Sequence, residues 1–96
     1  MLFRVTTRHE YKNCPAREGG FQSELFQETH EWVNGNDDVK VWGAWVSPTS
    51  HTGFSILETD AMENLVSLLK EPMHYGDVEI TPVIDLTEIV SIQTNE

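Results

Sequence analysis

The chain is poor in positive charge, in cysteine and in long apolar runs. It has 6 Lys and Arg against 16 Asp and Glu, so its formal net charge is −10. Because phosphate backbones and anionic lipids attract positive charge, this balance argues against nucleic-acid and membrane-surface partners. Cys14 is the only cysteine, and no apolar run approaches the roughly 20 residues of a membrane span or resembles a secretion signal. We therefore expect a soluble cytoplasmic protein with no intrachain disulfide.

Sequence motifs of catalysis and cofactor binding are also absent. Nothing matches a phosphate-binding loop, a dinucleotide fingerprint or a nucleophile elbow. The side chains that could bind a soft metal ion do not stand at the spacing of a zinc site; they are His9, Cys14, His30, His51 and His74. The spacing therefore predicts no metal and no cofactor. His51, which lies in a turn-rich segment, either has a catalytic or ligand-binding role or packs the loop.

Hydrophobic periodicity indicates the order of the elements. Alternation with period 2 predicts strands over residues 2–9, 39–46, 53–58 and 78–86, and spacing near 3.6 predicts helices over 21–33 and 61–69. This βαββαβ order is that of the ferredoxin-like unit, in which two helices cover one face of an antiparallel sheet. Residues 1–96 are therefore expected to form one α+β domain with strand order 4-1-3-2. Asp60 is expected to cap the second helix, and Pro72 to follow its end.

The second face of the sheet is expected to be covered by another copy of the chain. Pro82 donates no ladder hydrogen bond, which favours an edge position for the last strand. Trp42 and Trp45 have opposite parity in the strand 39–46, so both of its faces are expected to be covered. The apolar tail that begins at about residue 86 is expected to pack on a partner or on the open sheet face; it contains Leu86, Ile89, Val90 and Ile92. These features predict a homodimer.

The candidate site lies on the face of the first strand that points away from the helices. The strand order is expected to gather the following ligand-binding side chains there, with His51 close by: Arg4, Arg8, Trp42, Ser55 and Glu79. Arginine side chains bind carboxylates and phosphates, so this surface could hold a small anion. The alternative is that Arg4 and Glu79 simply satisfy each other in a dimer interface.

Four segments carry a resemblance to a known family. They are residues 1–6 (MLFRVT), 40–46 (KVWGAWV), 51–58 (HTGFSILE) and 76–85 (GDVEITPVID). With them the chain resembles an uncharacterised family of small prokaryotic proteins in the dimeric α+β barrel superfamily. The resemblance implies two ferredoxin-like subunits whose sheets face each other and enclose a cleft. Members of that superfamily include monooxygenases, isomerases and simple ligand binders, so it leaves the reaction open.

Two hypotheses on function follow. The first is a homodimer that binds a small anionic or aromatic metabolite in the barrel cleft. The second is a cofactor-independent enzyme, of monooxygenase or isomerase type, that uses His51 or His9 as general base in the same cleft. Because His51 has no assured acid–base partner in the sequence, binding is placed first.

Overall fold

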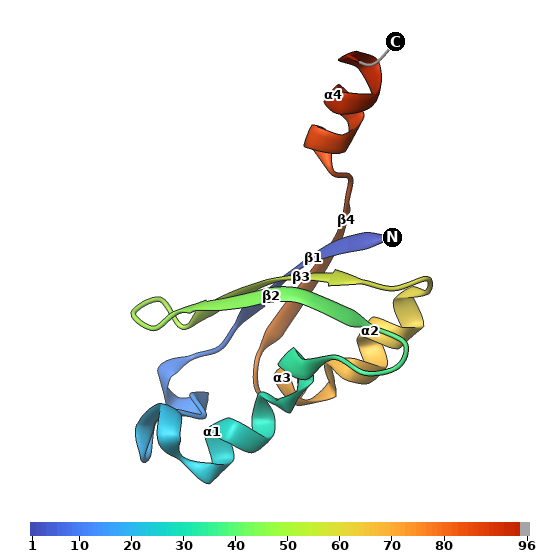
Figure 1. Cartoon of the computed structure of the whole chain (residues 1–96). Helices are drawn as coiled ribbons and strands as arrows, with labels where there is room; N and C mark the ends of the chain where they lie inside the picture. Colours follow the sequence, from blue (N-terminus) through green and yellow to red (C-terminus); the bar gives the residue numbers. More distant parts are fainter. Residues whose placement is uncertain (95–96) are drawn as a thin grey trace.

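The computed structural model describes the backbone of residues 1–94 and the side chains of residues 1–90. Its centre is a 4-stranded antiparallel sheet with the order β2-β3-β1-β4 (Figure 1). The strands are β1 (Leu2–Arg8), β2 (Lys40–Ser47), β3 (Thr52–Glu58) and β4 (Asp77–Val83). The α+β class and the predicted strand order are confirmed, and Pro82 lies in an edge strand, where proline is tolerated.

The helices α1, α2 and α3 lie on one face of the sheet (Figure 1). The helical segments between β1 and β2 are η1 (Tyr11–Asn13), η2 (Gly20–Gln22), α1 (Glu24–Thr29) and η3 (Glu31–Asn34). Those between β3 and β4 are α2 (Met62–Leu68) and α3 (Lys70–Tyr75). Both predicted helices are thus present on the expected face, but each is divided into shorter pieces.

The first predicted helix breaks after one and a half turns because side chains bond its last carbonyls. The Thr29 hydroxyl donates to the carbonyl oxygens of Leu25 at 2.8 Å and Phe26 at 3.1 Å. His30 Nδ1 lies 2.8 Å from the Phe26 carbonyl oxygen as well. Such local bonds compete with the helical ladder and favour a helix end. Pro72 follows the end of α2, as expected, and stands in the first turn of the additional helix α3, where a missing N–H is tolerated.

The hydrophobic core lies between the sheet and the pair α2 and α3. It consists of Phe3, Val5, Val39, Leu57, Leu65 and Leu69. Phe3 and Val5 belong to the face of β1 that alternation assigned to the helices. Thr7 continues the same face but is only half-buried, because the core does not extend to that end of the strand. The core is therefore confined to the half of the sheet near α2.

A bulge in β2 places both tryptophans of this strand on the face away from the helices. Val41 pairs with Leu57 and Gly43 pairs with Ile56, so Trp42 is an extra residue between two pairs. An extra residue reverses the parity of the positions that follow it. The expectation that Trp42 and Trp45 lie on opposite faces was therefore wrong. We use the name open face for the sheet surface opposite the helices.

The C-terminal helix α4 (Leu86–Thr94) continues beyond the end of β4 and does not fold back over the sheet (Figure 1). Asp85 caps its start, since Oδ1 accepts hydrogen bonds from the backbone N–H of Thr87 at 3.0 Å and of Glu88 at 3.3 Å. The predicted strand to residue 86 thus ends earlier, at Val83. In the part of the chain that the structure describes, α4 does not cover the open face (Figure 1), and the side chain of Ile92 lies outside the described residues. No helix in the described part is long and apolar enough to cross a membrane.

Ser23 and Asp60 provide a matched test of helix capping. Ser23 Oγ accepts a hydrogen bond from the Phe26 backbone N–H at 3.1 Å, at the start of α1. Asp60 does not cap α2, contrary to expectation: Ala61 is the N-cap, and no side chain of the described residues bonds there. We expect Ser23→Ala to lower the free energy of unfolding by about 0.5–2 kcal/mol. Asp60→Ala should change it by less than about 0.5 kcal/mol, as measured by urea unfolding. Equal losses in the two variants would contradict this assignment.

Candidate functional site

The predicted arginines are on the open face, as expected, and Arg8 also lines a cavity of about 420 Å³ together with His9 and Tyr75. Arg4 Nη2 lies 3.8 Å from Glu79 Oε1, and both side chains are more than half exposed. Arg8 is exposed at the end of β1 and has no ion pair with any side chain that the structure describes. The pair of Arg4 and Glu79 therefore matches the alternative in which these residues satisfy each other. At this exposure the pair contributes little to stability.

Ser55 does not belong to this group. It pairs with Val5, and directly opposed residues of an antiparallel pair share a face, so Ser55 points toward the helices. It is 2% exposed, and its hydroxyl has no hydrogen-bond partner among the described residues. The expectation that Ser55 lies beside Arg4 was wrong. It assigned Ser55 to the open face, whereas the pairing of β3 with β1 places Ser55 on the face that the helices cover.

Two neighbouring cavities lie between the sheet and the segment from α1 to η3. Their volumes are about 540 Å³ and about 230 Å³. They share the lining residues Thr7, Phe26, His30, Val46, Gly53 and Tyr75. The space exists because the sheet positions beneath it are small, with Ala44 and Gly53 among them, and because α1 is too short to fill it. None of the predicted ligand-binding residues on β1, β2, β3 or β4 lines either cavity.

Trp32 lines the larger cavity and carries an unpaired polar group. The indole Nε1 of Trp32 is buried, and within the described part of the chain it has no acceptor. A buried N–H without an acceptor costs about 1–3 kcal/mol, so its retention requires an explanation. His30 also lines this cavity and stacks on Phe26, with ring centroids 4.0 Å apart. Its Nδ1 donates to the Phe26 carbonyl oxygen, which cannot itself donate, so the proton of neutral His30 is on Nδ1.

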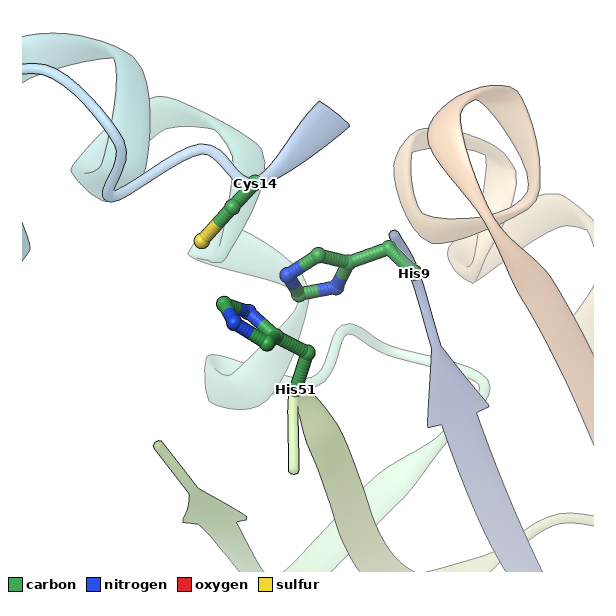
Figure 2. Close-up of side chains that lie close together, drawn as sticks. All are labelled: His9, Cys14 and His51. Atoms are coloured by element: carbon green, nitrogen blue, oxygen red, sulfur yellow. The ribbon is translucent and has the colours of Figure 1, made fainter. Parts of the chain in front are cut away.

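The smaller cavity brings together His9, Cys14 and His51 from three separate segments (Figure 2). Their ligand atoms all lie within 4.8 Å of one another. His9 follows β1, Cys14 follows η1, and His51 is in the turn between β2 and β3, where it has a φ of 52°. The His9 backbone N–H donates to the His51 carbonyl oxygen at 3.3 Å, which joins two of the segments. The two predicted candidate bases are thus neighbours.

Burial and neighbouring charge shift two pKa values here. Burial, and then the charges of His51 and His30, lower the pKa of His9 from 6.5. Its Nε2 is buried and makes no hydrogen bond with the described residues. Burial and the proximity of Cys14 raise the pKa of Tyr75 to about 12. The imidazole of His9 and the phenol of Tyr75 are therefore both neutral, and their rings meet edge to face with centroids 5.6 Å apart.

The lowered pKa of His9 predicts a pH dependence of stability in the metal-free protein. Unfolded His9 binds a proton with its ordinary pKa, so the unfolded state takes up more protons below about pH 6.5. The free energy of unfolding should fall as the pH drops from about 7.5 to about 5.5. His9→Gln should reduce this dependence of the free energy of unfolding on pH. His74→Gln should retain it, because the side chain of His74 is exposed. Urea midpoints at the two pH values measure this dependence; an unchanged dependence in His9→Gln would contradict the assignment.

Sequence reasoning missed the cavities and the cluster of His9, Cys14 and His51. Spacing along the chain cannot reveal a cluster whose members come from a strand end, a loop and a hairpin turn. Trp32 also gave no signal, since it lies on the apolar stripe of the predicted helix, where an aromatic residue is most often part of the core.

Comparisons with known proteins show a family and a fold. A family described as "Domain of unknown function (DUF3303)" matches residues 1–95. No curated protein matches the chain. The crystal structure of SCO4226 from Streptomyces coelicolor A3(2) is similar with a TM-score of 0.53 and 19% identity. The match covers 88% of this chain and 100% of that one. At this identity the likeness concerns the fold alone.

Proposed function

Because the chain belongs to the DUF3303 family, whose description gives no function, we propose a function from its own site. We propose that it binds a small aromatic molecule in the larger cavity beneath the sheet, and that it does so as a homodimer of the dimeric α+β barrel type. The aromatic part of the earlier expectation has more support than the anionic part, because Arg4 and Arg8 project from the other face of the sheet.

The observation that carries this proposal is the buried, unpaired Nε1 of Trp32, a residue that lines a cavity of about 540 Å³. This volume falls within the range of roughly 300–1,000 Å³ that small-molecule sites occupy. A ligand with a carbonyl, hydroxyl or ring-nitrogen acceptor would satisfy the indole N–H. The ring of Phe26, the ring of Tyr75 and the methyl groups of Val33 and Val46 offer apolar surface for an aromatic body.

Indole N–H resonances test this proposal directly. Coumarin, which is neutral and has a carbonyl acceptor, and 2-naphthoate, which is anionic, are titrated into protein labelled with nitrogen-15. We expect coumarin to move the indole resonance of Trp32 and to leave that of Trp42, whose Nε1 donates to Glu58 Oε1 at 3.0 Å. Trp32→Phe should weaken coumarin binding by about tenfold, the effect of one lost hydrogen bond, and the matched Trp42→Phe should not. A shift confined to Trp42, which does not line the larger cavity, would place binding on the open face and contradict the proposal.

The second candidate function is general-base catalysis in the smaller cavity. The observation that favours it is His9, whose buried Nε2 makes no bond with the described residues and whose lowered pKa keeps the imidazole neutral. A neutral imidazole in a cavity can remove a proton from a bound substrate. His51 is the alternative base in the same cavity. If this function holds, a compound recovered with the purified protein will be converted by it, while His9→Gln or His51→Gln will bind the compound without converting it.

The exposed aromatic side chains of the open face are the reason for proposing a homodimer. Three aromatic side chains are exposed there: Trp42 at 58%, Trp45 at 61% and Phe54 at 45%. Aromatic residues are enriched in interfaces, and each buries roughly 150–250 Å² when covered. Together they would supply much of the roughly 800 Å² that each partner contributes to a standard interface. The helices cover the other face, so a second open face is the surface that fits.

The segment that joins β4 to α4 also supports a homodimer formed through the open face. Ile84 and Leu86, at the junction of β4 and α4, are 78% and 69% exposed. Since α4 extends past the end of the sheet, these side chains would reach a subunit placed against the open face (Figure 1). Exposing the apolar side chains of Ile84 and Leu86 to water is unfavourable, and a second copy of the chain would bury them.

A further inference from the structure

We propose that His9, Cys14 and His51 bind a divalent transition-metal ion of the zinc type, in a site distinct from the cavity of Trp32 (Figure 2). All three donor atoms lie within 4.8 Å of one another. Tetrahedral zinc, with bonds of about 2.0–2.3 Å, requires donor atoms about 3.3–3.6 Å apart. Side-chain rotations that move the donors inward by about 1 Å are sufficient to reach this geometry.

The surroundings of the donors fit a metal ligand better than a packing residue. His9 Nε2 is buried without a hydrogen-bond partner among the described residues, although imidazole nitrogens at such positions are normally paired. Cys14 is a free, half-buried thiol. His51 is the only non-glycine residue of the described part with a positive φ, and this conformation directs its ring toward His9 (Figure 2). Strained backbone of this kind concentrates at functional sites.

The donor set also indicates the class of metal. One thiolate and two imidazoles suit borderline-soft ions such as zinc and cobalt, whereas magnesium and calcium require oxygen ligands. Three protein ligands leave a fourth coordination position, as in catalytic rather than structural zinc sites. The three residues line the smaller cavity, so an exogenous donor atom could occupy that position.

Metal binding and general-base catalysis exclude each other, because both require the imidazole nitrogens of His9 and His51. An ion bound to His9 and His51 takes up the lone pairs that a general base needs. The metal site does not depend on coumarin binding, because Trp32 and the larger cavity contribute no donor atom to it. The two proposals can therefore fail separately.

Cobalt titration tests the site in the full chain without a polyhistidine tag. After removal of bound metal with a chelator, the protein is titrated with Co²⁺ and then with Zn²⁺ in competition. We expect one ion per chain, a near-ultraviolet thiolate-to-cobalt absorption band and the intense visible absorption of tetrahedral cobalt. Zn²⁺ should abolish both signals and raise the melting temperature of the wild-type protein.

Variants separate this site from adventitious binding. Cys14→Ser should lose the thiolate band, and His9→Gln and His51→Gln should each weaken cobalt binding at least tenfold. His74→Gln is the matched control, because His74 is exposed and lines neither cavity, and it should bind as the wild type does. Far-ultraviolet circular dichroism of each metal-free variant establishes that it is folded. Absence of a thiolate band in the wild type, or wild-type affinity in Cys14→Ser, overturns the proposal.

Discussion

Glutamate at Trp45 and Phe54 is expected to convert the protein from a dimer to a monomer. These two residues pair directly across β2 and β3 on the open face, and both are exposed in the single chain. A charge there is solvated in the monomer but would be buried without a partner in the dimer, which is strongly unfavourable. Loss of one interface hot spot costs about 2 kcal/mol or more, so the double variant should raise the dimer dissociation constant by about 10³-fold.

Sedimentation velocity at micromolar concentration measures this change. Leu25→Glu is the matched control, because Leu25 is 57% exposed on α1, in the helical layer on the opposite side of the sheet. It should remain a dimer. Circular dichroism should show that both variants keep their secondary structure. A wild-type protein that sediments as a monomer, or a Trp45→Glu, Phe54→Glu variant that remains dimeric, would refute assembly through the open face.

The second large effect is expected for Gly35→Ala, which should lower the free energy of unfolding by at least about 2 kcal/mol. Gly35 ends η3 with φ 71° and ψ −164°, a combination that is open almost only to glycine. A Cβ atom at this position would lie 2.5 Å from the carbonyl oxygen of Val39. This oxygen belongs to the backbone and accepts a hydrogen bond from Asn36, so it cannot easily move.

Gly20→Ala isolates the steric part of this effect. Gly20 also has a positive φ, 69°, but a Cβ atom there would meet nothing within 4 Å. Only the conformational penalty remains, about 1 kcal/mol. Urea unfolding of the two variants measures the difference. Gly35 donates its N–H to the Trp32 carbonyl oxygen at 2.9 Å, so the displacement that a Cβ atom forces on this turn should also move Trp32 and weaken coumarin binding. Equal stability of the two variants would show that the turn after η3 relaxes freely.

The sequence by itself determined the order of the elements and the place of each strand. Alternation assigned Phe3 and Val5 to the core, and both are buried. Pro82 indicated an edge strand, and β4 is at the edge of the sheet. The ion pair of Arg4 with Glu79, which the sequence offered as the alternative to an anion site, is present. These predictions succeeded because they depend on local periodicity and on the chemistry of single residues. Both can be read from residues that are neighbours in the sequence.

Only the tertiary structure decided which side chains share a face or a cavity. One extra residue at Trp42 reversed the parity of the rest of β2, and no local pattern marks a bulge that depends on the partner strand. Breaking of the first helix at Thr29 and His30 left room for a cavity around Trp32. His9, Cys14 and His51 meet because the loop after β1 and the turn between β2 and β3 lie at the same end of the sheet. Contacts between residues distant in sequence are set by how the packed elements fit together, and spacing along the chain does not encode them.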